Sequence, residues 1–145
     1  PLDGVAAWSR IYGRRGFVQH QCVLPPPTAA GALAELLDRI VRRGDAAFLA
    51  VLKKLGASNG LVAFPFAGYT LALDFPLMPG LLGFLDELDA VVVKAGGRLA
   101  LPKDARQSRA TFDAGYPTAD AFRALRRTLD PDGRVRSRLS SRLGL

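Results

Sequence analysis

The sequence has few of the residues on which many catalytic sites depend, because its 145 residues include only one cysteine and one histidine. The lone Cys22 cannot form an internal disulfide, so nothing points to an oxidising compartment and a cytoplasmic location is favoured. A zinc site of the Cys/His type needs three or four such ligands. The sequence therefore predicts no metal site.

Two further features are missing. No run of about 18 apolar residues occurs, so no transmembrane segment is predicted. There is no glycine-rich phosphate loop of either common type, since Gly56 and Gly60 mark a turn and Gly96-Gly97 ends a helix. The sequence opens in loop-like residues at Pro1 rather than at a methionine, which leads us to expect a portion of a longer protein.

The composition is that of a globular domain, with 49% hydrophobic and 23% charged residues. The formal net charge of +7 favours anionic partners. Many of the positive charges lie in the last quarter of the sequence, at Arg123, Arg126, Arg127, Arg134, Arg136, Arg138 and Arg142. Two interpretations stay open for them: a solvated or interdomain face, or a functional anion site.

The hydrophobic pattern predicts the order β-α-β-β-α-β. Strands are expected over 17–24, 46–54 and 98–101, and a third extended region over 61–75 is interrupted by Pro65 and Gly68 and alternates clearly in its second half. One helix is expected from a Thr28 cap to Gly44 and another between Pro79-Gly80 and Gly96-Gly97. This order is typical of an α+β, ferredoxin-like fold, in which an antiparallel sheet packs both helices on one face and leaves the other free. A helical C-terminal tail follows.

We divide the chain into a lead-in segment (1–16), a sheet domain (17–101) and a C-terminal segment (102–145). The last has short helices over 105–114 and 118–128 and a basic amphipathic end. It carries too little apolar surface to fold alone, so we expect it to pack onto the sheet domain or onto a domain absent from this chain.

Polar side chains are predicted to gather on the free face of the sheet. Alternation puts Gln19 and Gln21 on one face of the first strand and His20 on the other. Lys53, Thr70 and, after the last strand, Lys103 extend this set, and such convergence indicates a binding surface. His20 has no nucleophile signature beside it, so we expect it to be structural.

One short stretch, Arg15-Gly16-Phe17-Val18, is similar to part of the RNA-recognition signature. That signature belongs on the third strand and needs further aromatic residues to stack bases, whereas glutamines follow Phe17 here. RNA binding is therefore disfavoured. A non-enzymatic, basic ferredoxin-like module that binds an anion or nucleic acid remains the alternative to an enzyme.

Segments along the whole chain resemble FAD-linked oxidases of the vanillyl-alcohol-oxidase class. They include Pro1–Val5, Gly16–Gln21, Leu49–Lys53, Asp74–Pro76, Gly96–Leu99 with Lys103-Asp104, and Leu129–Gly133. The resemblance implies the C-terminal, substrate-side part of an oxidoreductase that transfers hydride to FAD from a CH–OH group of a prenyl-phosphate pentose or an aldonolactone. It also implies that an absent N-terminal domain holds most of the FAD, so the chain alone should be inactive. It leaves homo-oligomers and membrane association open.

The resemblance further implies residue roles. Lys103 would be catalytic and cofactor-binding, stabilising the reduced flavin or orienting the substrate hydroxyl. The sugar pocket would be lined by Gln19, Gln21, Lys53, Thr70 and Ala72. Relatives carry cysteine at the position of Ala72, asparagine at Thr70 and tyrosine at His20, so this chain differs in hydrogen bonding near the substrate.

Overall fold

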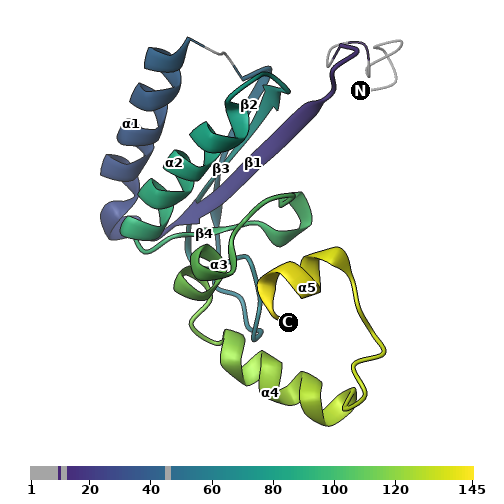
Figure 1. The fold of residues 1–145 in the computed structure, drawn as a ribbon. Helices are drawn as coiled ribbons and strands as arrows, with labels where there is room; N and C mark the ends of the chain where they lie inside the picture. The colour runs from purple at the N-terminus through teal and green to yellow at the C-terminus, as the bar shows by residue number, and fades with distance from the viewer. Residues whose placement is uncertain (1–9, 11–12, 45–46) are drawn as a thin grey trace.

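Strands and helices follow one another in the predicted order (Figure 1). The computed structural model describes residues 10, 13–44 and 47–145, so most of the predicted lead-in segment 1–16, and Ala46, lie outside the described residues. The elements are β1 (Phe17–Leu24), α1 (Pro26–Arg43), β2 (Leu49–Leu55), β3 (Gly68–Pro76), α2 (Leu81–Lys94), β4 (Arg98–Leu99), the 3₁₀ turn η3 (Leu101–Lys103), α3 (Arg109–Gly115), α4 (Ala119–Leu129) and α5 (Arg138–Leu143).

The four strands form one sheet in the order β2-β3-β1-β4, and all neighbouring strands are antiparallel. The long central pair sets Gln19 opposite Asp74, while β4 pairs only with Cys22 and Val23 of β1. This topology confirms the α+β, ferredoxin-like prediction. Because β4 is so short, most of β1 has no strand partner on that side.

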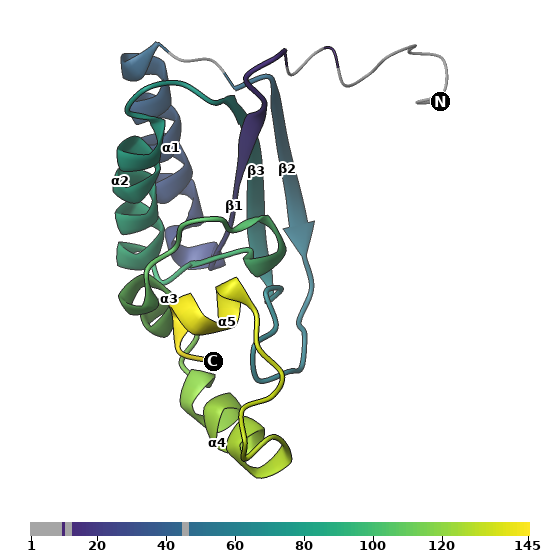
Figure 2. The ribbon, with the colours of Figure 1, turned by 45° about the vertical axis from the view of Figure 1, so that its right-hand side comes forward.

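The main core lies between the sheet and helices α1 and α2, which cover the same face (Figure 2). Alternate residues such as Leu71, Leu73 and Phe75 of β3 point into it and are almost fully buried. Each such side chain contributes about 1.5–3 kcal/mol by its removal from water. Alternation thus decides which strand residues stay on the uncovered face.

Cys22 lies on the core side of β1 and is 0% exposed. Burial raises the pKa of its thiol to about 12. Since the thiolate is the reactive form, a buried thiol with a raised pKa reacts very slowly near neutral pH. We expect no labelling of the native chain by an aromatic disulfide reagent and one thiol per chain after denaturation. Rapid labelling without denaturant would contradict this burial.

Two local predictions were wrong in detail. Helix α1 begins at Pro26 and its N-cap is Pro25, because proline suits the first helical turn, where no N–H partner is needed. Thr28 therefore lies inside the helix, and its hydroxyl donates to the carbonyl of Ala95 at 2.7 Å. In the predicted extended region 61–75, only the part from Gly68 onward is a strand. A Cβ at Gly68 would lie 2.3 Å from the carbonyl oxygen of Leu24, so glycine is needed there.

The C-terminal helices form a second, smaller core with the end of the sheet domain. Its buried members are Phe112, Tyr116, Ala119 and Leu143, with Val62 and Leu101 of the sheet domain packed against them. The hydroxyl of Tyr116 donates to the carbonyl of Leu99 at 2.6 Å. The tail thus packs onto the sheet domain, while the division at residue 101 stays a prediction. No helix in the described part of the chain is long and apolar enough to cross a membrane.

Candidate functional site

A hollow of about 210 Å³ lies on the sheet face that the helices leave uncovered. We call it the sheet-face hollow. It is lined by Gln19, Gln21, Val51, Lys53, Thr70, Ala72 and Lys103. All six residues predicted for the site therefore meet in one place, and Val51 joins them. Their roles stay predictions, but their proximity is a property of the fold.

Strand register explains most of this grouping. Val51 lies opposite Ala72, and Lys53 lies opposite Thr70, so β2 and β3 present these four side chains side by side. Gln21 lies opposite Ala72 on the other side of β3. Because residues two apart in a strand share a face, the pattern gathers small and polar groups over the centre of the sheet.

Lys103 reaches the hollow through the turn that follows β4. The N–H of Ala100 donates to the carbonyl of Gln21 at 2.8 Å, which continues the pairing of β4 by one bond. Pro102 has no N–H, so the ladder cannot extend further. The chain turns through η3 instead, and this turn sets Lys103 beside the glutamines of β1.

Both glutamines are oriented by neighbours on β3. The side-chain N–H of Gln19 donates to the carboxylate of Asp74, and that of Gln21 donates to the hydroxyl of Thr70 at 3.2 Å. Each amide keeps its carbonyl oxygen and its second N–H for another partner. The hollow can therefore offer both donors and acceptors to a polyhydroxy ligand.

The charge of the hollow is positive. Lys53 and Lys103 are exposed, and in the described part of the chain neither forms an ion pair. Asp104, next to Lys103, does not neutralise it, because its Oδ2 accepts from Arg142 at 2.5 Å and its Oδ1 accepts two backbone N–H groups. Two unpaired ammonium groups favour a ligand with a phosphate or a developing negative charge.

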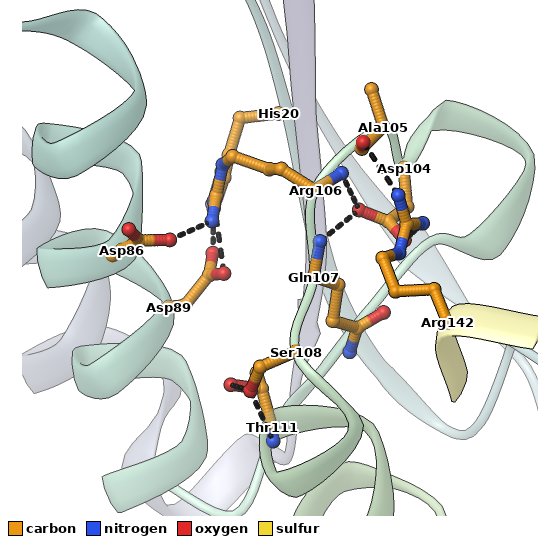
Figure 3. Close-up of polar contacts among 10 residues, drawn as sticks. All are labelled: His20, Asp86, Asp89, Asp104, Ala105, Arg106, Gln107, Ser108, Thr111 and Arg142. Carbon is orange, nitrogen blue, oxygen red and sulfur yellow. Dashed lines mark hydrogen bonds and ion pairs between the residues drawn. The ribbon is translucent and has the colours of Figure 1, made fainter. Parts of the chain in front are cut away.

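A buried polar network lies on the opposite side of β1 (Figure 3). Nε2 of His20 contacts Oδ1 of Asp89 at 2.9 Å, and Asp89 accepts from Arg106 through its other oxygen at 2.9 Å. The prediction that His20 is structural fits this placement. The sequence pattern did not identify Asp89, although its position four residues after Leu85, in the apolar stripe of α2, was a signal for a buried, paired carboxylate.

The arginines of the tail differ in their surroundings. Arg123 is buried and donates to the carboxylates of Asp113 and Asp120 and to the carbonyls of Leu143 and Gly144. The bonds to the two carboxylates, that to Asp113 first, raise its pKa. Arg123 is therefore part of the fold and not of a solvated face. A hollow beside it is lined by Arg126, Arg127 and Arg136, together with Asp130 and Arg123 itself. Among the described residues, no cluster of three or more potential ligands could hold a metal ion.

Comparison with known proteins identifies two informative relatives. The chain is 40% identical over its whole length to decaprenylphosphoryl-β-D-ribose oxidase of Mycolicibacterium smegmatis, and it covers 32% of that protein. It is 38% identical, over 99% of its length, to an uncharacterised protein in the mprA 5' region of Streptomyces coelicolor, and it covers 39% of that protein. The chain thus spans only 32% to 39% of the length of these relatives. No protein-family model matches it. The predicted resemblance to such an oxidase is confirmed.

Proposed function

We propose that this chain is the substrate-side part of an FAD-dependent oxidoreductase that oxidises a CH–OH group of a sugar-like substrate. The observation that carries the proposal is the sheet-face hollow, where two oriented glutamines, a hydroxyl and two lysines without an ion pair among the described residues surround one space. The similarity to an oxidase named for a prenyl-phosphate-linked ribose supports a substrate of that type, with an aldonolactone as the other candidate.

The residues of the hollow suit contact with a flavin ring at its edge, while most of the FAD would be held by another part of the protein. Lys103 offers an exposed ammonium, with no ion pair to residues 13–44 or 47–145, and such a group suits an anionic ring edge. When bound, the flavin supplies a hydride acceptor for the substrate carbon. The chain offers no glycine-rich loop for the pyrophosphate, so we assign most FAD contacts to an N-terminal domain of the same protein and expect the chain alone to be inactive.

Each lining residue then has a defined task. The free amide groups of Gln19 and Gln21 and the hydroxyl proton of Thr70 bind sugar hydroxyls. Lys53 binds the phosphate as a point charge. Ala72, with its small side chain, leaves space above the centre of the sheet. Lys103 orients the reacting hydroxyl and stabilises the negative charge that develops beside it.

The non-enzymatic alternative receives less support. Its best feature is the basic hollow lined by Arg126, Arg127 and Arg136. Two of these side chains, however, donate to backbone carbonyls: Arg126 to Val135 and Arg136 to Gly133. The sheet-face hollow, where a module of this fold would stack bases, is lined by amide, hydroxyl, aliphatic and ammonium groups instead of aromatic rings. We therefore infer no nucleic-acid partner.

Lys53→Ala in the whole flavoprotein is expected to raise KM for a short-chain prenyl-phosphoryl pentose about 10- to 100-fold, because a charge-assisted hydrogen bond contributes about 1.5–3 kcal/mol. Steady-state oxidation with an artificial electron acceptor measures this. Lys54→Ala is the matched control, since the next residue of β2 points to the other face of the sheet, and its KM should not change.

The same pair of variants distinguishes the two substrate classes. An aldonolactone has no phosphate, so its KM should be equal in Lys53→Ala and Lys54→Ala. If neither compound bleaches the flavin of the unmodified protein, the proposed function is wrong.

A further inference from the structure

The segment that carries Lys103 wraps around the open edge of β1. Beyond the bond from Ala100 to Gln21, the ladder ends and the chain crosses from one face of the sheet to the other. Lys103 lies in the hollow on the uncovered face, whereas Arg106, three residues later, reaches the carboxylate of Asp89 on α2. One short segment therefore contacts both sides of the same strand.

On the helix side, a chain of ion pairs joins the segment to α2 and to β1 (Figure 3). The guanidinium of Arg106 pairs with Asp89 and with Asp86, one turn apart on α2. The second oxygen of Asp89 binds His20, and the side chains of Asp89 and His20 are only 5% and 4% exposed. Because His20 stands between Gln19 and Gln21, the network connects the strand that carries the glutamines to the segment that carries Lys103.

A second anchor fixes the backbone directly after Lys103. One oxygen of Asp104 accepts the N–H groups of Arg106 and Gln107 at 2.9 and 2.7 Å, and the other accepts from Arg142 on α5. Arg142 also donates to the carbonyl of Ala105. The segment is thus held by α2 on one side and by α5 on the other, so its position depends on side chains distant in sequence.

From these contacts we propose that Asp89 and Arg106 are positioning residues for Lys103, an inference that rests on the proposed function. A buried ion pair is often no more stabilising than apolar residues of the same volume, so a gain in stability does not by itself account for the Asp89–Arg106 pair. The geometry of the pair suggests that it positions Lys103. The flexible side chain of Lys103 starts from a Cα whose distance to the glutamines is fixed by the network, and an error of about 1 Å in such a distance can cost on the order of 100-fold in rate.

The test uses Asp89→Asn, which keeps the shape of the side chain and removes the charge that Arg106 needs. In the whole flavoprotein we expect flavin reduction by substrate to slow about tenfold, with little change in KM. Glu87→Gln is the matched control, since it makes the same change on an exposed face of α2, and its rate should stay normal. Arg106→Lys keeps the charge but loses the forked geometry. Its rate of flavin reduction should lie between those of Asp89→Asn and Glu87→Gln.

A double-mutant cycle separates positioning from general damage. If Asp89 acts through Lys103, Asp89→Asn should slow flavin reduction no further in a protein that already carries Lys103→Ala. A further loss of similar size in that background would overturn the proposal, because it would indicate an effect independent of Lys103.

A second measurement needs neither flavin nor turnover. In the 145-residue chain, Asp89→Asn should speed amide hydrogen exchange at Arg106 and Gln107, whose N–H groups are bonded to Asp104, while amides of α1 keep their protection. Unchanged exchange at both positions would overturn the proposal. If Lys103→Ala itself leaves flavin reduction unchanged, the proposed function of Lys103 fails instead, whatever Asp89→Asn does.

Discussion

Lys103→Ala is expected to slow flavin reduction by about 100-fold or more in the whole protein, with much less effect on substrate affinity. Removing one preorganised group that stabilises developing charge typically costs two to three orders of magnitude in rate, about 2.7–4 kcal/mol. Lys103 can act in this way because its ammonium lines the sheet-face hollow without an ion pair among the described residues. Anaerobic stopped-flow absorbance at the flavin band measures the reduction step directly.

Two further replacements separate charge from size at this position. Lys103→Met keeps most of the length but no charge, so it should be as slow as Lys103→Ala. Lys103→Arg keeps the charge in a different geometry and should retain part of the rate. Lys94→Ala, at the exposed end of α2, is the control, and its flavin should be reduced at the normal rate. A normal rate in both uncharged variants at position 103 would show that this ammonium has no part in the reaction.

Phe112→Ala should lower the free energy of unfolding by about 3–5 kcal/mol, the cost of a large cavity in a packed core. Phe112 is fully buried, and its ring stacks on Tyr116 with 4.7 Å between centroids. Urea unfolding of the chain, followed by circular dichroism, measures the change. Leu125→Ala on the exposed side of α4 is the control and should stay within about 0.5 kcal/mol. Equal midpoints for the two variants would mean that the second core does not stabilise the fold.

The same replacement should also affect the candidate site. The core around Phe112 holds Leu143 of α5, and its neighbour Arg142 binds Asp104. Loosening this core therefore weakens the anchor directly after Lys103. The packing of the second core around Phe112 thus helps to fix the position of Lys103 in the sheet-face hollow.

The strand pattern predicted a large part of this site. Period-two alternation in β1 placed Gln19 and Gln21 on one face and His20 on the other, as the structure has them. The pattern also placed Lys103 after the last strand, near this polar face. Its catalytic role and the pocket roles came only from the resemblance to oxidases, because spacing alone gives an exposed lysine no chemical task.

Other features were beyond the sequence pattern because they depend on distant partners. Asp89 and His20 are 69 residues apart, and a helical stripe does not specify which strand residue will face it. Arg123 looked like one more charge of the basic tail, but α3 and α5 surround it. Thr28 had the chemistry of a helix cap, yet the prolines before it began the helix earlier.

The sequence by itself determined the order of elements, the two faces of each strand and the scarcity of nucleophiles and metal ligands, since these follow from local periodicity and composition. Only the tertiary structure decided that Lys103 lies beside the glutamines. This placement requires β4 to end after two residues and the chain to cross the edge of β1. It also requires Asp89 and Arg142 to hold the segment that carries Lys103. Such contacts form between elements that are far apart along the chain, and no local pattern encodes their distance.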